Sequence, residues 1–66
     1  MRSWLKQMRI NSGLAQLEVA NKLDISESYY CMIETGERMP KMTIEMANKL
    51  AKIFGVPIET ILVNEQ

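Results

Sequence analysis

Glycine, proline and helix-capping residues recur at close intervals along this chain of 66 residues and divide it into short segments. Gly13, Gly36 and Gly55 each follow a stretch with apolar residues at helical spacing, which is typical of the left-handed residue after a helix. No segment shows sustained alternation of polar and apolar residues, so a sheet is not expected. The pattern predicts an all-α fold, a compact bundle of five short helices.

Capping residues give the expected starts of these helices. The first follows Ser3, the second covers residues 16–23, the third follows Ser26, the fourth follows Thr43, and Pro57 opens the last. The fourth segment has the clearest amphipathic spacing, with apolar residues at i, i+3, i+4 and i+7: Ala47, Leu50, Ala51 and Phe54. On the third, Tyr30, Ile33 and Glu34 share one face and are expected to point inward.

The composition excludes several classes of protein. A chain of 66 residues suffices for one domain, expected over 1–66, with its core between residues 5 and 62. Cys31 is the only cysteine and histidine is absent, so neither an internal disulfide nor a Cys/His zinc site is expected, and no cofactor is implied. The residue patterns of acid–base or nucleophilic catalysis are missing, which argues against an enzyme. No apolar run is long enough for a membrane span, and we expect a cytoplasmic location.

The segments at 16–23 and after Ser26 are separated by three residues, Asp24-Ile25-Ser26, the length of the turn in a helix-turn-helix unit. From Leu5 to Leu62 the chain resembles the lambda-repressor-like, Cro/Xre-type helix-turn-helix DNA-binding family, with the unit itself at residues 16–35. The resemblance rests on several elements in order: LKQMR, Gln16, Ala20, the Ile25-Ser26 turn, and the run of Ile33, Glu34, Gly36, Arg38 and Pro40.

The resemblance implies a set of DNA contacts. The third helix would enter the major groove and present Glu27, Ser28, Tyr29 and Met32 to base edges. Phosphate contacts would come from the start of the second helix, the turn and the following loop: Gln16, Ser26, Arg38 and Lys41. It also implies that Arg9 and Glu34 form a structural salt bridge between the first and third helices. Read without this context, Gln16 would be a solvated residue at a helix start and Ser26 a helix cap. The other residues of the third helix would form its exposed side: Glu27, Ser28, Tyr29 and Met32.

Three residues depart from the family pattern. Ala15 stands where Ser or Thr usually caps the second helix, a change that costs about 1 kcal/mol in a typical helix. Asp24 replaces the usual glycine of the turn, and Glu37 occupies a position that is usually basic. These departures lower the expected stability and DNA affinity rather than question the fold.

Charge leaves two functions open. Eight basic and eight acidic residues cancel, whereas strong DNA binders are often basic. The first interpretation is a repressor-like homodimer that regulates transcription from a palindromic operator in double-stranded DNA. Its expected dimer interface consists of apolar residues towards the C-terminal end, some of which could instead close the core: Ile53, Ile58, Ile61 and Val63. The alternative is a protein-interaction module, such as the antitoxin or regulatory half of a protein pair, with a regulatory protein as its partner.

Overall fold

The computed structural model describes all 66 residues and contains five α-helices and no strand. These are α1 (Ser3–Asn11), α2 (Gln16–Leu23), α3 (Glu27–Thr35), α4 (Ile44–Phe54) and α5 (Ile58–Asn64). The predicted all-α fold and the number of helices are therefore confirmed. None of the helices is both long and apolar enough to cross a membrane.

All five helices contribute to one core. It is formed by the residues that the helical spacing turns inward: Leu5 from α1, Val19, Ala20 and Leu23 from α2, Tyr30 and Ile33 from α3, Met46, Ala47, Leu50 and Ala51 from α4, and Ile61 from α5. The small side chains of Ala20, Ala47 and Ala51 allow short helices to approach closely. The half-buried Trp4, Met8 and Phe54 pack against this core from outside.

Side chains cap two helices as predicted. The hydroxyl of Ser26 accepts a hydrogen bond from the Tyr29 N–H at 3.1 Å, and that of Thr43 accepts one from the Met46 N–H at 3.1 Å. The prediction for Ser3 is wrong, because Arg2 occupies the N-cap position and Ser3 is the first residue of α1. The Arg2 carbonyl accepts the first helical bonds, from Leu5 and Lys6, so α1 starts one residue early and without a side-chain cap.

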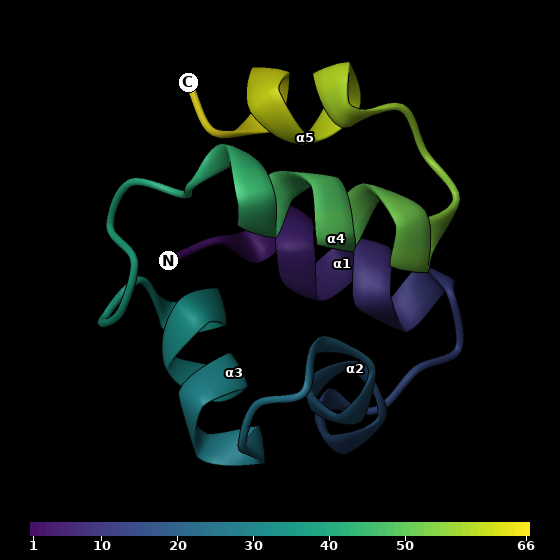
Figure 1. Cartoon of the computed structure of the whole chain (residues 1–66), viewed down its shortest axis with the longest axis vertical. Coiled ribbons are helices and arrows are strands. Elements are labelled where there is room, and N and C mark those ends of the chain that lie inside the picture. Colours follow the sequence, from purple (N-terminus) through teal and green to yellow (C-terminus); the bar gives the residue numbers. More distant parts are fainter.

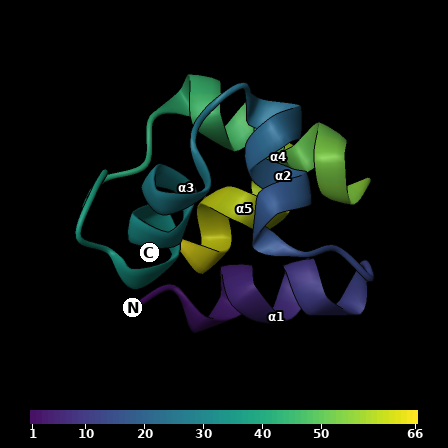
Figure 2. The same ribbon diagram turned by 90° about the horizontal axis from the view of Figure 1, so that it is seen from below.

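The helices are arranged so that α2 and α3 lie at one end of the molecule and α5 at the other (Figure 1). Helices α1 and α4 overlap in that view, but the view from below places them on opposite sides of the molecule (Figure 2). In both views the two ends of the chain lie on the same side as the α3–α4 loop. Helix α3 therefore lies beside α2 at one end of the molecule and leads into the α3–α4 loop (Figure 1).

Candidate nucleic-acid interface

The turn between α2 and α3 is tight because Asp24 adopts a left-handed conformation, with φ of 60° and ψ of 42°. The next residue folds back onto the helix, since the Ile25 N–H donates to the Ala20 carbonyl at 3.0 Å. Ser26 then caps α3. Two short helices are thus joined by three residues and packed through Val19, Leu23 and the inner face of α3.

The outer face of α3 is open. Glu27 and Ser28, in its first turn, are exposed, and Tyr29 and Met32 are half-buried. Tyr30, Ile33 and Glu34 on the opposite face are buried, as the helical spacing predicts. Helix α3 therefore presents one polar and partly apolar surface while its other face holds it on the core.

The loop after α3 carries two free cations. Arg38 and Lys41 are exposed, and neither takes part in a salt bridge. The loop is fastened to α3 by a hydrogen bond from the Arg38 N–H to the Met32 carbonyl at 3.2 Å. Their charges are available to an anionic ligand near the end of the open face of α3.

Beneath this surface lies a buried ion pair between α1 and α3. Arg9 Nε donates to Glu34 Oε2 at 2.7 Å, and Arg9 Nη1 donates to the Leu14 carbonyl at 2.9 Å. Glu34 is only 2% exposed, and its other oxygen accepts from Gln16 Nε2 at 3.0 Å. The expected Arg9–Glu34 bridge is present, and it includes Gln16, which sequence reasoning placed on DNA alone. Any phosphate contact by this amide must use its second N–H.

Burial and hydrogen bonding act in opposite directions on Glu34. Burial opposes ionisation of the carboxyl, but hydrogen bonds from Arg9 and Gln16 outweigh it and hold the pKa of Glu34 below its ordinary value of 4.5. The neighbouring Tyr30 hydroxyl is buried without a hydrogen-bond partner, and burial raises the pKa of Tyr30. The pair therefore remains charged at neutral pH, consistent with a structural role.

Arg2 is a structural residue that sequence reasoning missed. Its side chain is buried and donates to the Ile33 carbonyl at 2.6 Å, to the Met39 carbonyl, and to both carboxylate oxygens of Glu65. The hydrogen bonds from Arg2 lower the pKa of Glu65. Arg2 and Glu65 are 63 positions apart, and no local pattern signals such a contact.

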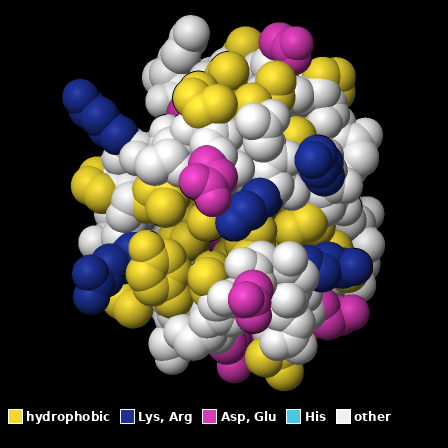
Figure 3. All heavy atoms as spheres, in the orientation of Figure 1, with side chains coloured by type: hydrophobic (Ala, Val, Ile, Leu, Met, Phe, Trp, Pro, Cys, Tyr) yellow, Lys and Arg dark blue, Asp and Glu magenta, His cyan; other side chains and the backbone are white.

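Charges of both signs are interspersed on one face of the molecule (Figure 3). On the face that Figure 3 shows, dark blue and magenta side chains alternate, with yellow apolar side chains gathered between them over α4 and towards α3. This face has no continuous basic patch, in keeping with the net charge of zero. Attraction of this face to phosphates would therefore depend on a few individual cations rather than on a net positive electrostatic potential.

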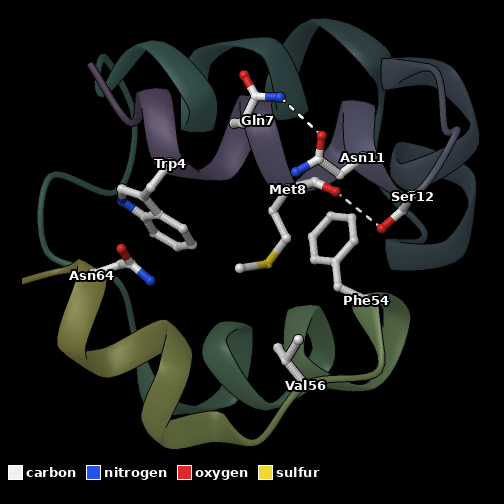
Figure 4. Close-up of a pocket in the computed structure, with 8 residues that line it drawn as sticks. All are labelled: Trp4, Gln7, Met8, Asn11, Ser12, Phe54, Val56 and Asn64. Atoms are coloured by element: carbon white, nitrogen blue, oxygen red, sulfur yellow. Dashed lines mark hydrogen bonds between the residues drawn. The ribbon is translucent and has the colours of Figure 1, made fainter.

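A surface hollow of about 410 Å³ lies away from this interface. Trp4 and Met8 from α1 face Phe54, Val56 and Asn64 across it (Figure 4). No residue of α2, α3 or the α3–α4 loop lines it. No three His, Cys, Asp or Glu side chains gather closely enough to hold a metal ion.

The structure corrects one of the residues expected at a dimer interface. Ile61 is fully buried in the core of the single chain and has no surface left for a partner. Ile53 and Ile58 are half-buried, while Val63 is 65% exposed. Val63 is thus the most accessible apolar side chain of α5.

The fold defines a small all-α module whose α2 and α3 form a helix-turn-helix unit. A family model described as a helix-turn-helix domain matches residues 3–66. The chain belongs to the helix-turn-helix family, of the Cro/Xre type that the motif resembles. The resemblance seen in the sequence is therefore confirmed.

The chain is also similar to curated transcriptional regulators. The chain is 46% identical over 55 residues to the uncharacterised HTH-type transcriptional regulator YqaF of Bacillus subtilis, covering 83% of this chain and 70% of that protein. It is 37% identical over 60 residues to the cryptic phage CTXphi transcriptional repressor RstR of Vibrio cholerae, covering 91% of this chain and 52% of the repressor. An uncharacterised HTH-type regulator of Methanocaldococcus jannaschii is 38% identical over 65 residues, which cover 98% of this chain and 96% of that protein. This chain thus spans about half the length of the phage repressor. No solved structure gives a significant match.

Proposed function

We propose that this protein is a transcriptional regulator that binds specific sequences in double-stranded DNA, with α3 in the major groove. The observation that carries the proposal is the open face of α3, held at its rear by the core and the Arg9–Glu34 pair, with Arg38 and Lys41 free beside it. A helix supported in this way fits the major groove and leaves nearby cations to contact the backbone. Such a protein binds DNA and is not an enzyme.

The residues divide into two roles. Base edges would be read from the outer face of α3: Ser28 can donate or accept, Glu27 can accept from the amino group of cytosine, Met32 can touch a thymine methyl, and Tyr29 can reach a base or a phosphate. The contacts to the DNA backbone would be sequence-independent and come from Gln16, Ser26, Arg38 and Lys41.

Repression by a homodimer is the specific form of this proposal. RstR is by its name a transcriptional repressor, and the relation supports the same role here. The longest dimension of the chain is 25 Å, less than the roughly 34 Å between successive major grooves on one side of DNA. One copy reaches one groove, so two copies related by a two-fold axis would read a palindromic operator.

A partner-binding role is the second candidate. It is favoured by the exposed Glu27 and Glu37, which place negative charge at the surface that would meet phosphates. A regulatory protein with a basic surface would fit this charge better than DNA does. The two functions differ in what happens at the outer face of α3.

The test is selection of binding sites from random duplex DNA, followed by affinity measurements at two salt concentrations. We expect a selected near-palindrome with half-sites one helical turn apart. Ser28→Ala or Glu27→Gln should change the selected bases, whereas Arg38→Ala should weaken all sites alike and reduce the salt slope by about 1. If replacing Glu27, Ser28 and Met32 together leaves the selected site unchanged, α3 is not the reading element. Failure to select any sequence favours the partner-binding role.

A further inference from the structure

Four parts of the chain meet at the guanidinium of Arg2. This side chain is 7% exposed and contacts the Ile33 carbonyl near the C-terminal end of α3, the carbonyl of Met39 in the α3–α4 loop, and the carboxylate of Glu65 after α5. The Arg2 N–H also donates to the Glu34 carbonyl at 2.7 Å. We name the side chains of Arg2 and Glu65 together the Arg2–Glu65 clamp.

The clamp adds to the attachments of the α3–α4 loop, whose Gly36 and Arg38 N–H groups donate to the Met32 carbonyl and whose Met39 and Met42 pack against the core. Met39 lies between Arg38 and Lys41 and has a φ of 53°, a backbone angle that residues other than glycine rarely adopt. Such a conformation persists where the surroundings fix it. Here the Arg2 guanidinium donates to the Met39 carbonyl, while the Arg38 N–H is bonded to Met32. The backbone between the two free cations is thus held by the residue that precedes α1.

A guanidinium paired with a carboxylate is well suited to this set of contacts. Its planar fork can bind a carboxylate and two carbonyls at once, which the ammonium of lysine does with poorer geometry. Glu65 neutralises the buried charge, with Nε–Oε2 and Nη2–Oε1 distances of 2.8 and 3.0 Å. Without Glu65, the buried guanidinium would be unpaired and drawn towards solvent, away from Met39.

We propose that Arg2 and Glu65 are positioning residues for DNA binding, which fix the α3–α4 loop so that Arg38 and Lys41 meet the phosphates beside the reading helix. The proposal rests on the proposed DNA-binding function, and it adds that residues distant from the interface in sequence control its phosphate contacts. Its first consequence, an ordered loop, is testable without DNA.

Limited trypsin cleavage of the folded protein reports the order of this loop, because trypsin cuts after Arg38 and Lys41. We expect Glu65→Ala to raise the cleavage rate at these bonds on the order of tenfold relative to the bond after Lys49 within α4. Glu59→Ala is the matched control, since Glu59 is an exposed glutamate of α5 with no ion pair. It should leave the ratio unchanged. An equal rise at all bonds would mean that Glu65 only adds global stability, and no rise would mean that the loop is ordered without it; either overturns the proposal.

DNA binding tests the second consequence. On a fixed 20-base-pair duplex, we expect Glu65→Ala to reduce the salt slope by about 2, as the loss of two phosphate contacts would. In a chain that already carries Arg38→Ala and Lys41→Ala, the same change should cost no further affinity. Glu59→Ala corrects for the altered net charge. Arg2→Lys keeps the positive charge but not the planar fork, so it should retain only part of the wild-type salt slope.

An additive loss in the variant that lacks both cations would overturn the positioning role, because Glu65 would then act on binding by another route. A wild-type chain that binds no duplex overturns the proposed function itself, and the clamp's role in DNA binding with it. The cleavage ratios would in that case still report whether the clamp orders the loop, so the two failures are distinguishable.

Discussion

At the scale of single residues, the Arg9–Glu34 pair shows how much depends on a buried charge having its partner. Both side chains are almost fully buried, at 10% and 3% exposed. Removal of Arg9 would leave the Glu34 carboxylate buried with only the Gln16 amide as a donor. We expect Arg9→Ala to lower the free energy of unfolding by about 3–5 kcal/mol, a large fraction of the stability of a small domain.

Urea denaturation followed by circular dichroism measures this loss. Lys6→Ala provides the control, because Lys6 is an exposed cation of the same helix without an ion pair. Its effect should remain within about 0.5 kcal/mol. A stable Arg9→Ala variant that merely binds DNA less tightly would show that Arg9 contacts DNA and that the pair is dispensable.

The two buried arginines differ in how far the sequence reveals them. The Arg9–Glu34 bridge follows from the family motif, and the helical spacing already places Glu34 on the inner face of α3. Arg2 precedes the first helix, and its partners are two backbone carbonyls and a residue 63 positions away. Backbone carbonyls have no signature in a sequence, so this contact required the three-dimensional structure.

At the scale of helices, local signals predicted most boundaries because caps and left-handed residues act within a few positions. Gly36 and Gly55 end α3 and α4 in the left-handed conformation, and Asp24 does so for α2 without being a glycine. The error at Ser3 has a tertiary cause, since Arg2 is fixed by contacts that a capping rule does not include. Exposure along α3 also matched the helical spacing, which is why its open face was predictable.

Helix α2 lacks half of a normal N-terminal cap. Ala15 has the extended N-cap conformation, with ψ of 160°, and its N–H donates to Glu18 Oε1 at 2.9 Å. A hydroxyl at this position would accept from the N–H of residue 18 and complete the capping box. We therefore expect Ala15→Thr to raise the free energy of unfolding by about 1 kcal/mol.

Thermal denaturation of Ala15→Thr and Ala15→Val separates the hydroxyl from the added bulk, because valine has the shape of threonine without the oxygen. The valine variant should be no more stable than the wild type. Equal stabilisation by both side chains would assign the gain to packing and leave the cap without effect.

At the scale of the whole molecule, the two lowered carboxyl pKa values link stability to pH. Glu34 and Glu65 have pKa values below the ordinary 4.5 in the folded chain. As the pH falls below that value, the unfolded chain therefore binds more protons than the folded chain does. The stability they contribute is complete above pH 4.5 and is lost as the pH falls through the folded-state values. We expect the melting temperature to fall on acidification in this range. Glu65→Gln should make that fall in melting temperature shallower. Glu59→Gln, at an exposed glutamate, should leave it unchanged. A melting temperature independent of pH below 4.5 would contradict the linkage.

The proposed dimer would connect this small chain to specific DNA binding. In the proposed mode of binding, one copy would offer a single reading helix and few phosphate contacts, too little for strong specific binding at physiological salt. The end of the molecule opposite α2 and α3 carries α5 (Figure 1), where a partner would leave both reading helices free. Val63 is 65% exposed there, with Ile53 and Ile58 half-buried, and Ile61 has no part in it.

We expect sedimentation equilibrium at micromolar concentration to show a dimer, and Val63→Lys to shift it to monomer, because an ammonium buried between two copies would lose its hydration without a partner. The exposed position of Val63 makes this change harmless to the fold of the single chain. Leu17→Lys is the matched control, since Leu17 is 50% exposed on α2, at the other end of the molecule, and this variant should remain dimeric.

Val63→Lys should also bind an isolated half-site as the wild-type monomer does but lose the gain in affinity that a full palindrome gives. A wild-type chain that stays monomeric and binds the half-site and the palindrome equally tightly would exclude the dimer and shift the interpretation towards a regulatory protein partner.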